Sequence, residues 1–285
     1  MLNIVREMNN KLGDKYVIKG RLGSGEFGEI VMGENKNTGR KVAIKIGRET
    51  DSIMLMNEAK IYNVLAGEEG FPKMLGYGKE GKYSYLIMEL LGKSLESKKR
   101  EYGKYKVGDV IKIGISIFKK LEKLHDIGYI HRDLKPENIV YGDANDSEEI
   151  YIIDYGLTAG YMVGGVHIDR REITSVIGTP RYISLNVHRG YLPSRRDDIE
   201  SVGYILIYLL VEKLPWQDIS ESDMKKRLKI VERIKRDEDI LELYPELSME
   251  FLTIIKYSRE LKYMERPNYR YLCGILENLL RISGI

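Results

Sequence analysis

Four polar residues near the middle of the chain have the types and spacing needed to transfer a phosphoryl group. Asp133, Lys135 and Asn138 lie in the run HRDLKPEN, and Asp154 follows a short apolar segment, at the start of an Asp-Tyr-Gly turn. Phosphoryl transfer depends mainly on aligning a hydroxyl with the phosphate and on neutralising charge on its oxygens. We predict that Asp133 accepts the hydroxyl proton and that Lys135 lies beside the transferred group. Asn138 and Asp154 are predicted to hold Mg²⁺.

Each of these residues also has an ordinary structural explanation. Asp, Lys and Asn are common in polar turns, and an isolated Asp-Tyr-Gly is merely a tight turn. However, the motifs occur together in the order and local context of protein kinases, which chance composition would rarely produce. The chain therefore resembles a protein kinase, and this resemblance implies ATP and Mg²⁺ as cofactors.

A glycine-rich run, GSGEFG at residues 23–28, lies between two segments that predict strands. A dinucleotide-binding fold would begin a helix directly after such a run, whereas this sequence continues as extended chain, as does a hairpin that covers ATP phosphates. Glycine lets the backbone approach phosphates closely enough for N–H groups to point at them. The residues predicted to contact the nucleotide in this hairpin are Leu22, Gly23, Gly25, Gly28 and Ile30.

Lys45 ends the alternating apolar segment Val-Ala-Ile-Lys. Alone it would be a solvated strand end, but after a glycine-rich hairpin we expect it to grip the α- and β-phosphates. Its expected partner is Glu58, which lies within a segment of helical apolar spacing at residues 53–65. Glu49 and Glu68 are alternatives outside that segment. The apolar residues at helical spacing are Ile53, Met56, Ile61, Val64 and Leu65.

A strand-like run at residues 83–88 is followed by Glu-Leu-Leu-Gly, which we expect to be a hinge between two lobes. An adenine ring needs a backbone donor, a backbone acceptor and apolar surfaces on its faces. Exposed backbone near Glu89 and Leu91 would supply the polar contacts. The residues predicted to contact adenine around the hinge are Ala43, Met88, Glu89 and Leu91. Core packing is the alternative explanation of Met88.

Composition agrees with one globular unit: of 285 residues, 43% are hydrophobic and 31% are charged. No apolar run approaches the ~20 residues of a membrane helix, and the first residues lack the apolar core of a secretory signal. The net charge is only +3, and the single cysteine, Cys273, excludes an internal disulfide. We expect a monomer in the cytoplasm or nucleus that binds neither nucleic acid nor membrane.

The predicted fold class is α+β, in the bilobal arrangement of protein kinases. The first lobe, residues 1–88, is expected to contain a small antiparallel sheet and one helix, and residues 89–92 are the hinge. Residues 93–285 are predicted to form a larger, mainly helical lobe of the same kinase domain. Within it, Asp198 matches a kinase aspartate that anchors the backbone of the catalytic loop.

Further motifs narrow the resemblance. They are Ser-Leu-Asn at residues 184–186, Ser-Arg-Arg-Asp-Asp at 194–198, Leu-Pro-Trp-Gln at 214–217, Arg-Pro-Asn-Tyr-Arg-Tyr-Leu at 266–272 and Met-Glu-Leu-Leu-Gly-Lys-Ser-Leu-Glu at 88–96. Together they resemble the casein kinase I family over nearly the whole chain, whereas vaccinia-related and tau-tubulin kinases share only part of them. The resemblance implies a serine/threonine kinase whose protein substrates carry acidic or phosphorylated residues upstream of the acceptor.

The resemblance also implies how activity is regulated. Several members of the family carry an inhibitory tail or terminal cysteines for lipid anchoring, whereas this chain ends at Ile285, soon after its last predicted helix. The family typically needs no phosphorylation of the segment corresponding to residues 161–179. We therefore expect constitutive activity.

Several positions depart from the family pattern, including a basic residue that the family has where this chain has Thr174 and Ser175. Tyr155 replaces the usual phenylalanine of the metal-binding turn, and its hydroxyl needs a partner if it is buried. Thr-Ala-Gly at residues 158–160 stands where the family usually has two lysines of an anion pocket. The residues that remain to bind a substrate phosphate are Arg181, Arg132, Lys225, Lys226, Arg227 and Lys229. A solvated helix face is the alternative explanation of the last four.

A second hypothesis, of a different class, is a nucleotide-binding pseudokinase that acts as a scaffold. Pseudokinases usually lack a metal ligand, the catalytic base or the phosphate-binding lysine. All of these are present in this chain, so the sequence favours an active enzyme.

Overall fold

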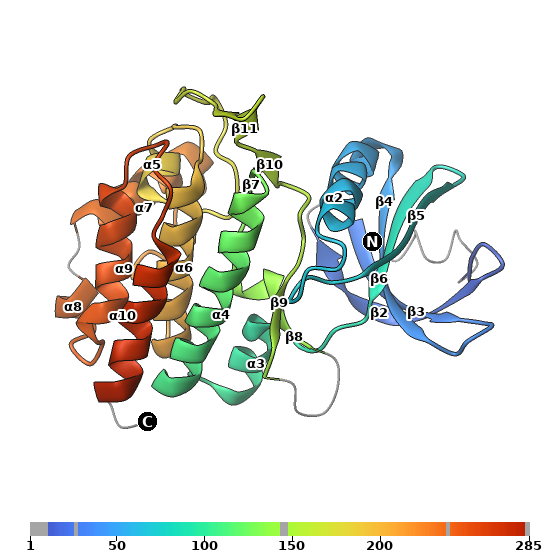
Figure 1. Cartoon of the computed structure of the whole chain (residues 1–285), viewed down its shortest axis with the longest axis horizontal. Coiled ribbons are helices and arrows are strands. Elements are labelled where there is room, and N and C mark those ends of the chain that lie inside the picture. The colour runs from blue at the N-terminus through green and yellow to red at the C-terminus, as the bar shows by residue number, and fades with distance from the viewer. Residues whose placement is uncertain (1–10, 26–27, 143–147, 238–239, 283–285) are drawn as a thin grey trace. The chain divides into compact units, whose positions relative to one another are not determined.

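The computed structural model describes residues 11–25, 28–142, 148–237 and 240–282. The chain divides into two compact units, which can be followed by colour in Figure 1. The first unit comprises Met1–Gly92 and Val140–Gly156, and the second comprises Lys93–Ile139 and Leu157–Ile285. Glu26 and Phe27, from the predicted phosphate-binding hairpin, lie outside the described residues.

An antiparallel sheet is the main element of the first unit. Its strand order is β1-β2-β3-β4-β6-β5, and each neighbouring pair is antiparallel. Side chains from one face, including Val31, Ile44 and Ile87, form an apolar core. The strands are β1 (Lys11–Leu12), β2 (Tyr16–Gly25), β3 (Gly28–Asn35), β4 (Lys41–Arg48), β5 (Met74–Glu80) and β6 (Tyr83–Glu89).

Helix α2 (Ser52–Val64) packs against β4, β5 and β6, and it follows the short 3-10 helix η1 (Glu49–Asp51). A helix was predicted at this place, and two of the apolar residues that indicated it, Ile61 and Leu65, are buried. Leu55, Ala59 and Tyr62 are buried, together with Glu58. Three of the apolar residues that indicated the helix are instead exposed, by 71%, 40% and 50%: Ile53, Met56 and Val64.

A two-stranded ribbon, β8 (Ile139–Tyr141) with β9 (Ile150–Ile152), leads the chain to Asp154. Its residues from Val140 onward group with the first unit. The contact that ties it to the segment after β6 is a hydrogen bond from Gly92 N to the Tyr141 carbonyl, at 2.8 Å.

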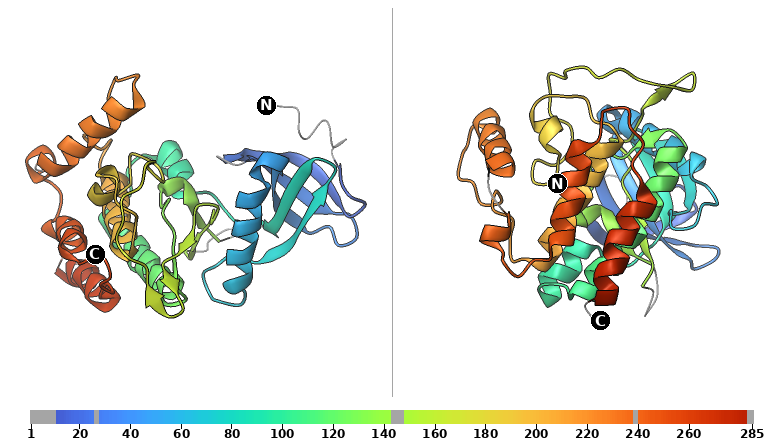
Figure 2. Two further views of the ribbon diagram at one scale, coloured as in Figure 1. Left: turned by 90° about the horizontal axis from the view of Figure 1, so that it is seen from above. Right: turned by 60° about the vertical axis from the view of Figure 1, so that its left-hand side comes forward.

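The second unit is mainly helical. Helix α6 is its centre, because every residue from Arg195 to Leu209 is buried. It packs against α4 and α9, and α10 packs against α4 (Figures 1 and 2). The helices are α3 (Leu95–Tyr102), α4 (Val107–Asp126), α5 (Leu185–His188), α6 (Arg195–Leu210), α7 (Met224–Asp237), α8 (Ile240–Leu243), α9 (Met249–Glu260) and α10 (Tyr269–Ile282).

Short elements of the second unit lie around the catalytic-loop sequence. Strands β7 (Tyr129–Ile130) and β10 (Ala159–Gly160) pair before and after it, and the 3-10 helix η2 (Pro136–Asn138) closes it. A small hairpin, β11 (Met162–Val163) with β12 (Val166–His167), follows β10. In the part of the chain that the structure describes, each helix is too short or too polar to span a bilayer.

Candidate active site

In the first unit, Lys45 meets two carboxylates. Its side chain is only 2% exposed, and its Nζ lies 2.8 Å from Glu58 Oε2 and 2.8 Å from Asp154 Oδ1. Strand β4 supplies the lysine, helix α2 supplies the glutamate, and the turn after β9 supplies the aspartate. The structure thus pairs Lys45 with the glutamate that the helical segment had indicated.

The charges of Lys45, Glu58 and Asp154 influence one another strongly. Burial alone would lower the pKa of Lys45, but Glu58 and Asp154 outweigh that effect and raise it, so the lysine stays a cation. Burial raises the pKa of Glu58 to about 7, although Lys45 opposes the rise. A buried glutamate of this kind holds a cation only while it is deprotonated, which makes the pair sensitive to pH near neutrality.

The register of the sheet brings the predicted nucleotide-contacting residues of three strands onto one face. Ile30 pairs with Lys45, and Ala43 pairs with Met88. Because Ala43 and Lys45 are two residues apart on one strand, both pairs point to the same face. Lys45 meets Glu58 of α2 there, so this face is the one that α2 covers.

Two glycines of the predicted hairpin have different environments. Gly28 has a φ of +145°, and a Cβ there would lie 2.2 Å from the carbonyl oxygen of Ile46, so the packing of β3 on β4 itself requires glycine. At Gly23 a Cβ would meet open space. Gly25 pairs with Gly28 across the hairpin, and Leu22 is 49% exposed. The openness of the backbone at Gly23 fits a hairpin that approaches phosphates.

After β6, the backbone of the predicted hinge is partly engaged. The N–H of Glu89 donates to the Lys73 carbonyl at 3.0 Å, and its side chain accepts from Lys73 N at 2.7 Å. A contact between Glu89 and adenine would therefore use the carbonyl of this residue. Met88 is 9% exposed, whereas Leu91 is half-buried.

Asp154 adopts a strained backbone conformation. Its φ is +66°, a left-handed value that costs about 1 kcal/mol or more in a residue with a Cβ. Its N–H donates to the Tyr62 hydroxyl at 3.4 Å, and its Oδ1 accepts from Gly156 N at 3.4 Å. The surrounding contacts therefore hold the carboxylate in place at a cost in backbone strain.

Tyr155 is fully buried, and its hydroxyl donates to the Ile152 carbonyl at 2.7 Å. This confirms that the extra hydroxyl, once buried, finds a partner. The ring also meets the ring of Tyr62 edge-on, with centroids 5.0 Å apart. Asn57 of α2 lies 3.5 Å from the Tyr155 carbonyl. The tyrosine thus ties the turn to β9 and to α2.

In the second unit, Asp133 is held from both sides. Its Oδ1 accepts from the N–H of Thr179 at 2.9 Å and from the Thr179 hydroxyl at 2.7 Å. Its Oδ2 accepts from Lys135 Nζ at 2.6 Å. Asn138 Nδ2 donates to the Asp133 backbone carbonyl at 3.0 Å. The structure therefore brings the three predicted residues of HRDLKPEN together with Thr179, whose contact was not foreseen.

The predicted metal ligands belong to different units, and each has chemistry that fits Mg²⁺. Asn138 uses its amide nitrogen for the Asp133 carbonyl, which leaves the oxygen as its ligand atom. Asp154 offers a carboxylate held by the strained turn. Carboxylate and amide oxygens are the ligands that Mg²⁺ accepts in proteins.

Asp198 anchors the catalytic-loop backbone, as predicted. Its Oδ2 accepts from His131 N at 2.7 Å, and its Oδ1 accepts from Arg132 N at 2.9 Å. His125 Nε2 lies 2.9 Å from Oδ2. Although burial would raise the pKa of Asp198, these partners lower it. The anchor holds Arg132 in a left-handed conformation, with a φ of +70°, one residue before the predicted base.

The residues predicted to bind a substrate phosphate lie in three separate environments. Arg132 donates through Nε to the Leu157 carbonyl at 2.5 Å, a structural contact. Arg181 is half-buried, with its guanidinium 5.8 Å and 5.9 Å from the ring centroids of Tyr182 and Tyr208. The residues on α7 are mostly exposed, with only Arg227 half-buried: Lys225, Lys226, Arg227 and Lys229.

Comparison with known families matches this chain to one family model. The model is described as a protein kinase domain, and it matches residues 16–275. The match spans both units. It covers Lys45, Glu58 and Asp154 in the first unit, and it covers Asp133, Lys135 and Asn138 in the second.

Proposed function

Because the chain belongs to the protein kinase family, we propose that it is a serine/threonine kinase that transfers the γ-phosphate of ATP to proteins. The antiparallel sheet with its helix and the helical second unit are those of the bilobal kinase fold. The observation that carries the proposal is the arrangement around Asp133, with Lys135 on one carboxylate oxygen and Thr179 on the other. A carboxylate held in this way is oriented before the substrate arrives.

In this proposal the residues of the second unit act on the attacking hydroxyl. Asp133 accepts its proton as the oxygen attacks the γ-phosphorus, and the bond to the β-γ bridging oxygen breaks. Lys135 stabilises negative charge on the transferred group. Thr179 prevents the Asp133 carboxylate from turning away, because it occupies one oxygen with two hydrogen bonds.

The residues of the first unit, together with Asn138 of the second, act on the nucleotide. Lys45 binds the α- and β-phosphates, and Glu58 orients its ammonium group. Asn138 and Asp154 would hold Mg²⁺, which neutralises charge on the phosphate oxygens when it is bound. Since a pseudokinase usually lacks one of these groups, the retention of Lys45, Asp133 and Asp154 supports catalysis over a scaffold role.

We further propose that the enzyme is active without phosphorylation of residues 161–179. Kinase activation by phosphorylation commonly serves to form the lysine–glutamate pair of the first lobe. In this chain Lys45 and Glu58 are 2.8 Å apart, so the pair is formed in this structure.

Substrates with acidic or phosphorylated residues upstream of the acceptor are proposed from the casein kinase I motifs. The exposed basic residues of α7 and the half-buried Arg181 support this choice, because they offer cations to a substrate anion. Arg132 contributes less to the proposal, since its guanidinium is engaged with the Leu157 carbonyl.

The test is phosphate transfer from labelled ATP to casein in the presence of Mg²⁺, followed by identification of the phosphorylated amino acid. Phosphoserine or phosphothreonine is the expected product. ATP binding without any transfer would favour the scaffold, and phosphotyrosine as the sole product would contradict serine/threonine specificity.

A further inference from the structure

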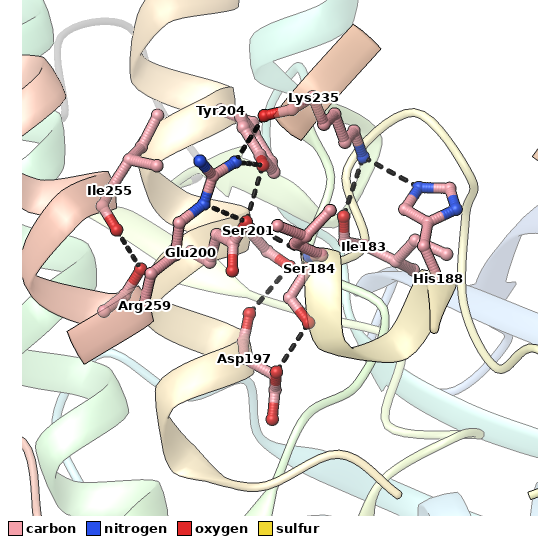
Figure 3. Close-up of polar contacts among 12 residues, drawn as sticks. Ile183, Ser184, His188, Asp197, Glu200, Ser201, Tyr204, Lys235, Ile255 and Arg259 are labelled. Atoms are coloured by element: carbon pink, nitrogen blue, oxygen red, sulfur yellow. Dashed lines mark hydrogen bonds and ion pairs between the residues drawn. The ribbon is translucent and has the colours of Figure 1, made fainter. Parts of the chain in front are cut away.

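Lys235 of helix α7 is a buried lysine whose amine binds the segment next to Thr179. Its side chain is only 3% exposed. Its Nζ donates to the Ile183 carbonyl at 2.7 Å and lies 3.2 Å from His188 Nε2 (Figure 3). It also donates to the Pro180 carbonyl at 3.1 Å. A lysine amine keeps at least two N–H groups in either protonation state, so both carbonyl bonds persist if it loses its proton.

Burying this amine is costly, which calls for a compensating role. Burial lowers the pKa of Lys235, and although Glu200 opposes that effect, Arg259 adds to it. Glu200 is itself occupied, with Arg259 Nε at 3.1 Å and the Tyr204 hydroxyl at 2.6 Å (Figure 3). An apolar residue at position 235 would avoid the desolvation cost, so the bonds to the two carbonyls are the evident gain.

The two carbonyls belong to a tight turn that begins at Thr179. Tyr182 N and Ile183 N both donate to the Thr179 carbonyl, at 2.9 Å and 3.1 Å. Thr179 in turn gives two hydrogen bonds to Asp133. Lys235 therefore binds two carbonyls of a turn whose first residue, Thr179, orients the proposed base, Asp133.

The turn also lies directly against the catalytic loop. A Cβ on Gly178 would be 2.4 Å from the Arg132 carbonyl oxygen, and Gly178 has a φ of +95°. A small displacement of the turn would therefore change the contact between the turn and this loop. From the other side, Trp216 Nε1 donates to the Arg181 carbonyl at 2.8 Å, so Lys235 and Trp216 together fix the backbone of the turn.

Contacts from neighbouring helices hold both the backbone and the amine of Lys235 in place. Its own carbonyl accepts from Arg259 Nη2 at 2.8 Å, and Arg259 also binds Glu200 of α6. The Lys235 amine lies 4.6 Å and 5.1 Å from the ring centroids of Tyr204 and Trp216. The end of α7 is thus tied to α6 and α9, and its amine has little freedom to move.

We propose that Lys235 is a positioning residue for phosphoryl transfer: it holds the Thr179–Ile183 turn in place and, through Thr179, sets the orientation of the Asp133 carboxylate. This inference rests on the proposed kinase function, and it adds to that function a residue that never touches the reactants. It gives α7 a role in catalysis, whereas the sequence had assigned to this helix only substrate-phosphate binding by Lys225, Lys226, Arg227 and Lys229 or, alternatively, a solvated face.

The test replaces Lys235 by methionine, which keeps an unbranched apolar stem and removes the amine. We expect kcat for casein phosphorylation to fall by roughly tenfold or more, since a misplacement of ~1 Å at a reacting group can cost ~10²-fold. The KM for ATP should stay within about twofold of the wild-type value, because Lys235 belongs to the second unit and acts on the base.

Lys99→Met is the matched control. Lys99 is also buried in the second unit, at 8% exposure, and its Nζ donates to the carbonyls of Tyr208 and Val211 at 2.8 Å and 2.6 Å. These carbonyls lie at the end of α6. Lys99→Met therefore loses bonds comparable to those lost in Lys235→Met, but none of them is to the Thr179–Ile183 turn. Its kcat should remain near that of the wild type at a temperature where both variants are folded.

The inference is overturned if Lys235→Met keeps wild-type kcat, or if the two methionine variants lose kcat equally. Should Lys235→Met fail to melt cooperatively, Lys235→Gln replaces it, because its side chain keeps a polar end but is one bond too short to make both bonds to the Ile183 and Pro180 carbonyls. A lower kcat with unchanged KM for ATP then supports the inference, and wild-type kcat contradicts it. Failure of the wild-type protein to phosphorylate casein or any peptide would contradict the proposed function instead.

Discussion

Thr179 gives two hydrogen bonds to a single carboxylate oxygen of Asp133, from its N–H at 2.9 Å and from its hydroxyl at 2.7 Å. The two residues are 46 positions apart in the chain. The opposite oxygen of Asp133 accepts from Lys135 at 2.6 Å. The proposed base is therefore restrained by a segment that lies well beyond the catalytic loop in sequence.

Removal of the Thr179 hydroxyl should weaken catalysis without eliminating it. We expect Thr179→Ala to lower kcat by roughly tenfold, because a hydrogen bond to a charged group is worth about 1.5–3 kcal/mol and the backbone N–H remains. Steady-state kinetics with casein measure the change. Thr174→Ala, at an exposed position of the same segment, serves as the control. Equal kcat for Thr179→Ala and the wild type would show that the hydroxyl does not position the base.

Activity should depend on pH through Glu58. Burial raises the pKa of Glu58 to about 7, so this carboxylate gains a proton as the pH falls through that value and then holds Lys45 less strongly. We expect kcat/KM for ATP to fall on the acidic side of about pH 7. In Glu58→Gln, kcat/KM should be low throughout and this acidic limb should be absent. An unchanged acidic limb in the variant would assign the titration to another group.

The hydroxyl of Tyr155 should matter more for stability than for turnover. Tyr155→Phe removes the bond to the Ile152 carbonyl but keeps the buried ring. We expect the free energy of unfolding to fall by about 1 kcal/mol, the usual net value of such a bond, with little change in kcat. Chemical denaturation measures the free energy of unfolding, and Tyr102→Phe, at an exposed tyrosine, serves as the control. A large loss of kcat at unchanged stability would mean that the hydroxyl acts directly on the metal-binding turn.

Recognition of a phosphorylated substrate should depend on Arg181. A charge-assisted hydrogen bond is worth roughly 1.5–3 kcal/mol, so Arg181→Ala should lower kcat/KM about tenfold for a peptide with an upstream phosphoserine. An unphosphorylated peptide should be affected less. Lys225→Ala, on the exposed side of α7, tests whether the basic residues of this helix bind the substrate phosphate or only form a solvated face. Equal losses on both peptides would make Arg181 structural, consistent with its contacts to the rings of Tyr182 and Tyr208.

The local patterns predicted most of the fold because they are set by neighbouring residues. The strands, helix α2 and the anchoring role of Asp198 all follow from periodicity or motif. The buried side of α2 followed only in part: Ile61, Leu65 and Glu58 are buried, whereas Ile53, Met56 and Val64 are exposed, because apolar residues occur on more than one side of this helix. Helical spacing alone cannot choose between sides that are both apolar.

The residues missed at the site are those whose roles depend on distant contacts. Thr179 was not among the predicted site residues, and nothing local indicates that it reaches Asp133. Lys235 lies in the same basic helix as Lys225 and Lys229, yet it is 3% exposed whereas those two are exposed. The sequence alone does not distinguish Lys235 from the other two lysines, because its burial results from tertiary packing.

The most direct test of the central claim is phosphate transfer to casein by Asp133→Asn. This change keeps the size of the side chain and removes its ability to accept a proton, so kcat should fall by roughly 10²–10⁴-fold, the usual contribution of a general base. ATP affinity and the melting temperature should be nearly unchanged, and Asp109→Asn, at an exposed position at the start of α4, should behave as the wild type. Wild-type turnover in Asp133→Asn would contradict the assignment of Asp133 as the base.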